Sequence, residues 1–485
     1  MFAVSLQENL RRFQSDFDGS VDLIVRRLRV GGLDAAFLSM EGLINKQIAA
    51  QSVLAPLVNA SFPGGSPEVK FRYLQERVLS AADQKEVTEY ADALSLLMSG
   101  FALLLLDACR SVLAVGIQGF SFRSVGDPQN ESIQRGSREG FVEPLQINMT
   151  MLRRRMKTTK LKFEQLKLGN ESGTLVCLCY LRDRVSPALL RDVRRQLSSA
   201  KLDAVLAAGY VTPFLRRPGA AFSLFSTVGL SERPDTVCGK IEEGRIAVLV
   251  DGTPNGAIVP HLFMENFHSF DDYVSRPFYT AFTRILKLLA FFLAMFLPGF
   301  YVAASTFHPE LIPEPLLLKI AQSEMNTPFS ILIEAMVIHI IYEIMREAGL
   351  RAPKSLGHAV SIVGALVIGD AAVNSGLVGA PTLMVIALTA ISSYLVPSLY
   401  EPVAVCRLAL ILIGGTIGFW GLMTAMFFIT ANVCSEASYG VPFSAPVSPF
   451  SLRAFLRDVV LRAGWPKLGR RVEKIQELPG STFGR

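Results

Sequence analysis

The chain has 485 residues, of which 50% are apolar and 19% are charged, and its mean hydropathy is +0.37. Because a soluble chain usually carries about 25% charged residues, this composition is shifted toward that of a membrane protein. The net charge of +6 is modest, and the basic residues near the apolar half suit anionic lipid headgroups better than nucleic acid. No zinc-finger, basic-zipper or RNA-reading signature is present, so we expect no nucleic-acid partner.

The charges are unevenly distributed along the chain. Up to about Arg284 the sequence is mixed and charged, whereas the runs that follow carry almost no charge. The N-terminus at Met1 lacks a basic stretch followed by an apolar one, so we expect no cleaved signal peptide. Six scattered cysteines predict buried thiols in a reducing, cytoplasmic environment. Cys177 and Cys179 share one side of a predicted strand, but no second Cys/His pair completes a metal site, and we expect no metal or other cofactor.

The first part of the chain alternates between helices and strands. Residues 5–20 predict a short amphipathic helix, and residues 21–43 predict a helix followed by a strand and a turn. Residues 100–120 have the apolar density of a spanning helix, but Asp107 and Arg110 interrupt them. Two strands joined by a turn that places both charges at the surface fit this stretch better.

The same alternation continues beyond a polar, turn-rich stretch. Residues 174–181 predict a strand, and a helix is expected from Pro187 to about Ser199 because a serine and a proline open it. Residues 245–263 predict two strands around an Asp-Gly turn. The expected fold class is therefore an α/β, cytosolic N-terminal region of two small lobes, followed by an all-α polytopic membrane domain. The expected divisions are the lobes 1–122 and 123–283, the helical domain 284–445 and a basic tail 446–485.

The C-terminal half contains apolar segments near the length of about 20 residues that spans a bilayer. The expected spans are residues 288–305, 328–344, 359–377, 381–399 and 403–430. Basic residues before the first span, after the second and in the tail all predict cytoplasmic positions. Five spans would place the tail outside, so either the last segment folds back on itself or one segment is re-entrant.

Three stretches of the sequence keep the order and spacing of one known family. They begin at Arg135 (RGSREGFVEPLQINMTMLRRRM), at Glu232 (ERPDTVCGKIEEGRIAVLVDGTP) and at Tyr301, where the apolar block starts with YVAASTFHPELIP. The chain thereby resembles the A subunit of the spore germination receptors, the GerA family, which includes a relative associated with the dipicolinate-channel operon. Ser137 stands where the family commonly has proline, so the match departs from the pattern in places.

The resemblance implies a non-enzymatic integral protein of the spore inner membrane with a cytosolic N-terminal region. In that family the A subunit works beside a permease-like subunit and a lipoprotein subunit. It is similar to subunits thought to form an oligomeric channel that releases monovalent cations during germination, so we expect a homo-oligomer. A secondary-transporter subunit and a membrane scaffold for a permease-like partner are the alternatives. Pro298–Gly299 and Gly414–Gly415 hint at the broken helices of such transporters.

The third expected span carries one charge, Asp370, where Gln is common in the family, and Asn374 stands where Glu is common. A carboxylate inside an apolar span usually faces water or a partner, and Leu366, Asp370 and Asn374 share one line of a helix. We hypothesise that this helix lines a pore, with Asp370 attracting cations and Ile362 or Val363 forming an apolar gate. A hydrogen bond between packed helices is the alternative. An adjacent stripe of small residues is expected to pack against another helix: Ser361, Ala365, Gly369, Ala372 and Gly376.

Other ionisable residues invite similar hypotheses. Glu334 and Glu343 are nine residues apart and fall on opposite helix faces, whereas His339 and Glu343 are one turn apart and can pair. Buried polar packing is favoured for these three over an ion pathway, and a His-Glu pair alone is a weak metal site. The basic run of Arg153, Arg154 and Arg155 predicts either a contact with lipid headgroups or a neighbouring subunit, or a solvated helix face. No phosphate loop, GxSxG or HExxH motif occurs, so no catalytic site is expected.

Overall fold

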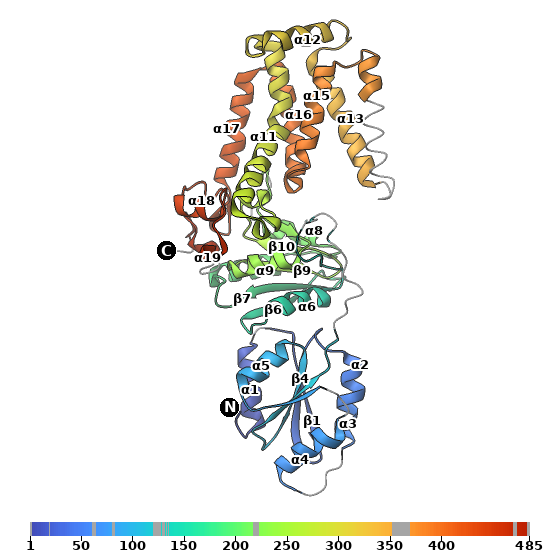
Figure 1. The fold of residues 1–485 in the computed structure, drawn as a ribbon, viewed down its shortest axis with the longest axis vertical. Helices are drawn as coiled ribbons and strands as arrows, with labels where there is room; N and C mark the ends of the chain where they lie inside the picture. Colours follow the sequence, from blue (N-terminus) through green and yellow to red (C-terminus); the bar gives the residue numbers. More distant parts are fainter. Residues whose placement is uncertain are drawn as a thin grey trace.

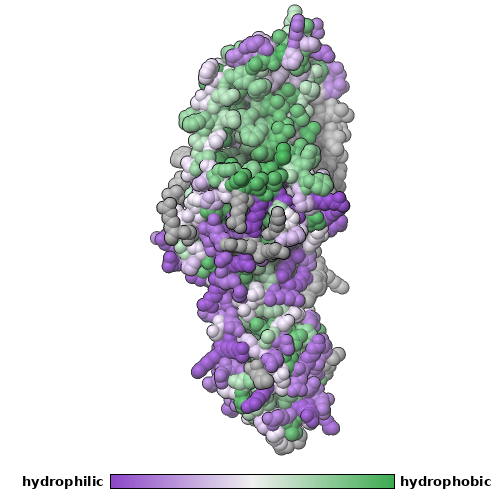
Figure 2. All heavy atoms as spheres, turned by 60° about the vertical axis from the view of Figure 1, so that its left-hand side comes forward, coloured by the Kyte–Doolittle hydropathy of each residue, from purple (hydrophilic) through white to green (hydrophobic). Residues whose placement is uncertain are grey.

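The protein is described here by a computed structural model covering residues 2–482 except 19, 61–64, 80–82, 120–127, 129–130, 132, 134, 217–222, 352–368 and 469–472. Two α/β units are stacked end to end below a bundle of long helices (Figure 1). Figure 2 shows the face of the molecule on which the bundle is largely hydrophobic and the α/β units are largely hydrophilic. The expected order of an α/β region and then a helical part is confirmed.

The first unit is built on a five-stranded antiparallel sheet with the order β1-β2-β4-β5-β3. Its strands are β1 (Leu23–Val30), β2 (Leu33–Met40), β3 (Gln84–Val87), β4 (Phe101–Leu106) and β5 (Val112–Gly116). The helix expected over residues 21–30 is wrong, because this segment is β1, paired with β2 across Gly31 and Gly32. Both glycines have positive φ (54° and 80°), as a tight hairpin turn requires. The two strands expected within residues 100–120 are confirmed as β4 and β5.

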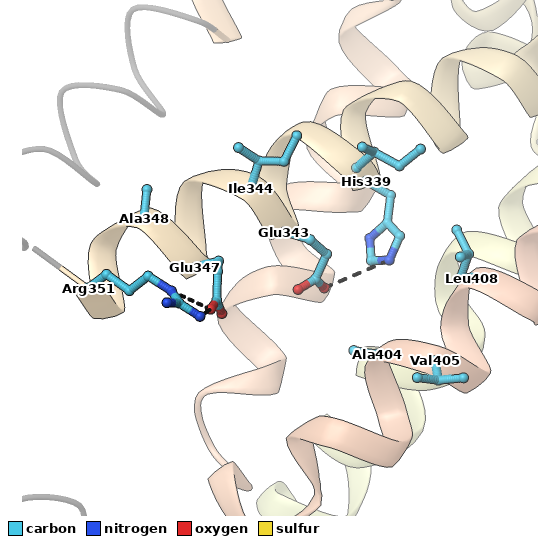
Figure 3. Close-up of a pocket in the computed structure, with 10 residues that line it drawn as sticks. His339, Glu343, Ile344, Glu347, Ala348, Arg351, Ala404, Val405 and Leu408 are labelled. Atoms are coloured by element: carbon cyan, nitrogen blue, oxygen red, sulfur yellow. Dashed lines mark hydrogen bonds and ion pairs between the residues drawn. The ribbon is translucent and has the colours of Figure 1, made fainter.

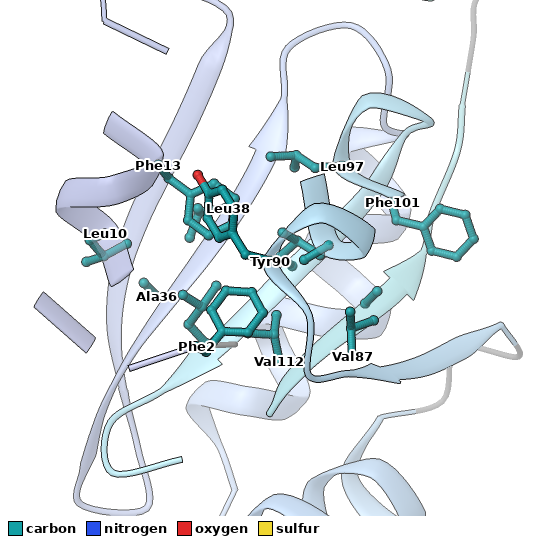
Figure 4. Close-up of a cluster of buried hydrophobic side chains, with 14 of the residues drawn as sticks. Phe2, Leu10, Phe13, Ala36, Leu38, Val87, Tyr90, Leu97, Phe101 and Val112 are labelled. Atoms are coloured by element: carbon teal, nitrogen blue, oxygen red, sulfur yellow. The ribbon is translucent and has the colours of Figure 1, made fainter. Parts of the chain in front are cut away.

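Helices cover both faces of this sheet. The expected amphipathic helix is α1 (Leu6–Asp16), which packs with α5 (Tyr90–Met98) on one face. In Figure 4, Phe13, Tyr90 and Leu38 meet in this core. The other face buries side chains of the helical segment that includes α2 (Lys46–Ile48), α3 (Ala55–Val58) and α4 (Pro67–Tyr73). The first unit therefore has its own two-sided hydrophobic core.

The second unit repeats this arrangement. Its antiparallel sheet has the order β6-β7-β9-β10-β8, which is the same relative order as in the first unit. The strands are β6 (Leu161–Leu168), β7 (Thr174–Leu181), β8 (Gly229–Ser231), β9 (Ile246–Val250) and β10 (Gly256–Val259). On one face lie α6 (Leu145–Arg155) and α9 (Pro234–Glu242), and on the other α7 (Pro187–Ser198) and α8 (Ala208–Val211). The predicted strand at 174–181, the helix from Pro187 and the hairpin at 245–263 are confirmed.

The helical part begins with α11 (Pro277–Phe307), which runs away from the α/β units, and α12 (Glu314–Glu324) lies across its far end (Figure 1). The remaining long helices of the described bundle are α13 (Ile331–Arg351), α15 (Ala380–Ser393), α16 (Tyr400–Thr416) and α17 (Phe419–Ser435). Two segments, Pro277–Phe307 and Pro397–Thr416, are long and apolar enough to cross a membrane, and α15 and α17 are shorter apolar helices. Length and composition thus indicate membrane association for the bundle.

The last expected span, residues 403–430, folds back on itself. It forms α16 and α17, which are separated by a turn at Gly418 with φ of 74°. After α17 the chain returns to the second α/β unit, where Ile475 N donates to Glu243 O at 2.9 Å. The tail elements are β11 (Ala437–Ser438), β12 (Val441–Pro442), α18 (Leu452–Asp458) and α19 (Trp465–Leu468). The tail therefore lies at the same end of the bundle as the N-terminal region (Figure 1).

Glycines allow α11 and α16 to pack closely. A Cβ on Gly299 would lie 2.7 Å from the carbonyl oxygen of Leu410, and a Cβ on Gly414 would collide with the carbonyl oxygen of Gly299. α11 continues from Pro277 to Phe307 through Pro298, so Pro298–Gly299 does not break it. The hint of a broken helix at this position is wrong, because the glycine serves close helix contact.

We predict that Gly414→Ala lowers the unfolding temperature of the purified chain in detergent. The added methyl meets backbone rather than a side chain that can move, and overpacking of this kind costs about 1–3 kcal/mol. Gly239→Ala in α9 is the control, because a Cβ there meets nothing within 4 Å. Unfolding of the Gly414→Ala variant at the wild-type temperature would contradict the close packing.

Candidate functional site

A buried arginine joins the base of the bundle to the segment before it and to the tail. Arg284 in α11 places its Nε 2.8 Å from Oδ2 of Asp272, in α10 (Asp271–Val274). Its Nη1 donates to Oδ1 of Asp458 and to the carbonyl oxygen of Val459, both at 3.0 Å. Burial raises the pKa of Asp458, although Arg284 favours the charged form of that carboxyl. This network fixes the base of α11 against the segment just before it and against the tail, which is distant in the sequence.

A second buried network of charges surrounds Glu265, in the short helical turn Phe263–Phe267 that precedes α10. Glu265 lies 2.5 Å from an Nη2 of Arg245 and 2.6 Å from Nζ of Lys240. Burial alone would raise the pKa of Glu265, but Arg245 and Lys240 hold it well below its usual range. Because each of these charges has a partner, we interpret the network as structural.

Between α13 and α16, five charged and aromatic side chains form a group that we call the Glu343 cluster. Glu343 accepts a hydrogen bond from Tyr400 Oη at 2.6 Å. Its carboxylate lies 3.5 Å from Nε of Arg346, 3.8 Å from Nη2 of Arg407 and 3.8 Å from Nε2 of His339. The guanidinium of Arg346 stacks over the Tyr400 ring at 3.4 Å. The contact of His339 with Glu343 agrees with their spacing of one helical turn, and two arginines share the one carboxylate.

The Glu343 cluster contains polar atoms that lack hydrogen-bond partners among the described residues. Arg407 is fully buried, and its three guanidinium nitrogens are among these atoms. Others are Nδ1 of His339, Oε1 of Glu343 and Nε of Arg346. A buried polar atom without a partner costs about 1–3 kcal/mol, and more for a charged group. Within the described residues these groups are therefore held by ion-pair contacts of 3.5–3.8 Å to Glu343 and not by full hydrogen bonding.

A cavity of about 620 Å³ adjoins the cluster. In Figure 3, His339 and Glu343 lie on α13 across from Ala404, Val405 and Leu408 of α16. Toward the end of α13, Arg351 pairs with Glu347 at 2.8 Å. The cavity thus has both charged and apolar walls.

Glu334 occupies a separate position near the far end of the bundle. Its Oε2 accepts from Gly379 N and from Thr382 Oγ1, both at 3.1 Å, and Thr382 Oγ1 lies 3.2 Å from Tyr301 Oη. Glu334 thereby connects α13 with α15 and, through Thr382, with α11. The two carboxylates Glu334 and Glu343 contact different helices, as their nine-residue spacing predicts.

Asp370 and Asn374 are both exposed, in a helical segment at the end of the bundle away from the α/β units. This segment ends at Gly376, with φ of 68°, so Asp370 lies near the rim of the bundle rather than midway along it. Gly369 is buried, and Ala372 packs in a cluster with residues of α13 and α15. The remaining residues of the expected pore line, gate and small-residue stripe lie outside the described residues: Ser361, Ile362, Val363, Ala365 and Leu366.

Arg153 joins the two α/β units. Its side chain is 1% exposed, and its Nε and Nη2 bind the Asp22 carboxylate of the first unit at 2.7 and 3.1 Å. The guanidinium also donates to the carbonyl oxygens of Thr158 and Leu161 at 2.7 and 2.9 Å. With its donors directed inward, Arg153 offers no surface to a lipid headgroup or a neighbouring subunit, contrary to that expectation.

Neighbouring residues strengthen this junction. Lys162 donates to the carbonyl oxygen of Asp16 at 2.7 Å, and burial lowers the pKa of Lys162 to about 8. Arg154 and Arg155 both bind Glu139, at 2.5 and 2.6 Å, and remain partly exposed. A contact role outside the chain stays a prediction for these two arginines.

Comparison with known proteins identifies the family. A family model described as "Bacillus/Clostridium GerA spore germination protein" matches residues 11–474. Spore germination protein KA of Bacillus subtilis (strain 168) is 34% identical over 482 residues, which cover 98% of this chain and 88% of that protein. The chain belongs to the GerA family. The resemblance found in the sequence is thereby confirmed.

Two further matches accompany this result. A Bacillus subtilis (strain 168) protein named "Uncharacterized membrane protein YfkQ" is 32% identical, over 96% of this chain and 90% of that protein. The N-terminal domain of the A subunit of the Bacillus megaterium spore germinant receptor GerK3, a crystal structure, is 29% identical with a TM-score of 0.42, covering 54% of this chain and 97% of that one.

The sequence analysis missed the basic side of the Glu343 cluster. Arg407 lies within the last expected span, and a charged residue inside an apolar segment is itself a signal of a functional or buried polar site. Arg346 follows the second expected span, where a basic residue indicates the cytoplasmic side, and Tyr400 lies between the last two expected spans. Only the packing of α16 against α13 brings these residues to Glu343.

We predict that Arg153→Gln destabilises the joined α/β units by about 3–5 kcal/mol, since it leaves the buried Asp22 carboxylate without its ion partner. Calorimetry of the full chain should show a lower first unfolding transition. Arg154→Gln is the control, and removal of this partly exposed pair should cost about 1 kcal/mol or less. Adding Asp22→Asn to Arg153→Gln should cost little more than either change alone. If the losses in unfolding free energy from Arg153→Gln and Asp22→Asn were fully additive, the result would contradict an ion pair between Arg153 and Asp22.

Proposed function

We propose that this GerA-family chain is an A-type subunit of a spore germination receptor or channel in the spore inner membrane. Its copies assemble to form or gate a pathway for monovalent cations. It works beside permease-like and lipoprotein subunits and has no catalytic role. The observation that carries the proposal is an exposed carboxylate, Asp370, on a bundle whose outer surface is apolar.

The exterior of the bundle supports a membrane location. Many of its large apolar side chains are exposed, among them Leu289 (52%), Val405 (71%), Trp420 (81%) and Phe427 (68%). Exposed apolar surface of this extent is unfavourable in water and is typical of a membrane or protein interface. The relative YfkQ is named as a membrane protein, which agrees with this location.

The connection of the tail supports a cytosolic position for the α/β units. The α/β units and the tail meet at the same end of the bundle, so both belong to one compartment. Their lysines and arginines favour the cytosolic side of the membrane. Asp370, at the other end, then faces the opposite compartment.

The position and the charge of Asp370 support a cation pathway. An ionised side chain is costly beside lipid and favours water or a partner group. At the rim of an assembled pore, a ring of Asp370 carboxylates from neighbouring copies would concentrate cations. A single copy supplies one such carboxylate, so the proposal requires assembly.

A membrane scaffold for a permease-like partner is the second candidate. The exposed apolar helices and the two α/β units would serve assembly equally well in that case. The secondary-transporter hypothesis has less support than the pore or the scaffold. Helix α11 is continuous through Pro298 and Gly299 and does not supply the expected helix break. Ion flux separates a pore from a scaffold.

We predict that the purified chain, reconstituted in liposomes, carries rubidium ions and that Asp370→Asn reduces this flux several-fold. Asp370→Glu keeps the charge and should restore it. Glu314→Gln is the matched control, because it removes an exposed carboxylate from α12 at the same end of the bundle. It should leave the flux unchanged.

Two results would contradict this account. A chain that inserts into liposomes but carries no rubidium argues for the scaffold. Flux that Glu314→Gln lowers as much as Asp370→Asn would show a general effect of surface charge rather than a site at Asp370.

A further inference from the structure

The carboxylate of Glu334 is buried, and only one of its two oxygens has partners. The residue is 2% exposed, and its Oε2 accepts from Gly379 N and from Thr382 Oγ1, both at 3.1 Å. Its Oε1 is also buried and has no hydrogen-bond partner among the described residues. A buried acceptor without a partner is destabilising, and more so when the group is charged. A ligand at Oε1 would therefore stabilise this part of the bundle.

The surroundings of Glu334 supply partial positive charge but no full counter-charge. Gly379 is the N-cap of α15, and the N-terminus of a helix carries a partial positive charge. Within the described part of the chain, Glu334 forms no ion pair with a lysine, arginine or histidine. The two arginines that bind a carboxylate of α13, Arg346 and Arg407, do so at Glu343, about 13 Å further along the helix. The charge of Glu334 is thus left unbalanced.

Hydroxyl groups lie next to this carboxylate. Thr382 donates its hydroxyl proton to Glu334, so the hydroxyl of Tyr301, 3.2 Å from Thr382 Oγ1, donates to Thr382 in turn. This chain of donors leaves the Tyr301 oxygen free to accept or to coordinate. Ser305 lies one helical turn after Tyr301 on α11 and interacts with its side chain. The carboxylate is therefore the end of a row of oxygen atoms.

A fourth helix approaches the same carboxylate. A Cβ on Gly379 would lie 2.6 Å from Oγ of Ser323, in α12, and 3.4 Å from Oε2 of Glu334. The glycine thus lets the hydroxyl of Ser323 come close to the carboxylate. Helices α11, α12, α13 and α15 each contribute oxygen atoms to this region, at the end of the bundle far from the α/β units (Figure 1).

We propose that Glu334 binds one monovalent alkali cation. The ion contacts Oε1 of Glu334 and is surrounded by the neighbouring hydroxyl oxygens. Hard cations take oxygen ligands, and a single carboxylate balances a single positive charge. A divalent ion would leave an excess charge in apolar surroundings, which is unfavourable. This inference rests on the cation pathway given under the proposed function, which brings such ions to the bundle.

A proton is the alternative occupant of Oε1. A protonated carboxyl group is itself a hydrogen-bond donor and then needs an acceptor, whereas an alkali cation uses the oxygens that are already present. The two occupants differ in what they respond to. An alkali cation responds to the kind and concentration of salt, and a proton responds to pH alone.

The test is a rubidium titration of the purified full chain in mild detergent. The unfolding temperature is followed while rubidium chloride replaces choline chloride at constant total salt, and equilibrium dialysis with radioactive rubidium measures binding. Choline is the reference because its bulky ammonium group cannot be coordinated by closely spaced oxygens. Rubidium should raise the unfolding temperature and should do so in a saturable manner.

A conservative variant tests the carboxylate itself. Glu334→Gln keeps an oxygen that accepts from Gly379 N and Thr382 Oγ1 but removes the charge, so it should weaken rubidium binding about tenfold or more. Glu314→Gln, which removes an exposed carboxylate from α12, is the control and should bind like the wild type. Thr382→Val removes one hydroxyl and should weaken binding several-fold. It keeps the test informative if Glu334→Gln fails to fold.

Three results would overturn the proposal. An unfolding temperature that is the same in rubidium and in choline would show that no alkali cation is held. An equal loss of binding in Glu314→Gln and Glu334→Gln would show a general effect of surface charge. Stabilisation by acidification but not by rubidium would assign Oε1 to a proton. Flux in liposomes is a separate measurement, so loss of this site with intact flux is distinguishable from failure of the proposed channel.

Discussion

The buried guanidinium of Arg284 determines how the soluble and apolar parts of this chain are joined. By binding Asp272 and Asp458 it ties the first long helix to the segment before it and to the tail after the last helix. Removal of one partner of a buried ion pair leaves an uncompensated charge and is destabilising, so the three segments depend on one another. The tail is thereby held at the α/β end of the bundle, and this placement supports a single-sided arrangement of both termini.

The α/β region consists of two units with one strand order, joined through Arg153 and Asp22. Much of this region follows from local sequence signals. The strand at 174–181, the helix from Pro187 and the hairpin around Asp251 and Gly252 were predicted, because apolar alternation and turn residues are local. The strand at 23–30 was missed, although the Gly31–Gly32 pair that forms its turn is visible in the sequence. The duplication was not predicted, because the order of strands in a sheet depends on contacts that are distant along the chain.

The candidate site was predictable only in part. Composition identifies Glu334, His339 and Glu343 as unusual within an apolar segment, and helical spacing correctly separates Glu334 from the His339–Glu343 pair. Whether a carboxylate is free or neutralised depends on the neighbouring helix, and Arg407 of α16 reaches Glu343 only in the folded bundle. Similarly, Gly299 and Gly414 resemble helix breaks in the sequence, whereas in the structure they let two continuous helices approach. The pore and gate residues before Gly369 stay predictions.

The central claim is that copies of this chain assemble, because one chain supplies a single Asp370. The most direct measurement is the mass of the complex, obtained by native mass spectrometry of the purified full chain in mild detergent. The account predicts one discrete, closed homo-oligomer. A monomer or dimer at every protein concentration would contradict a pore formed by this chain alone.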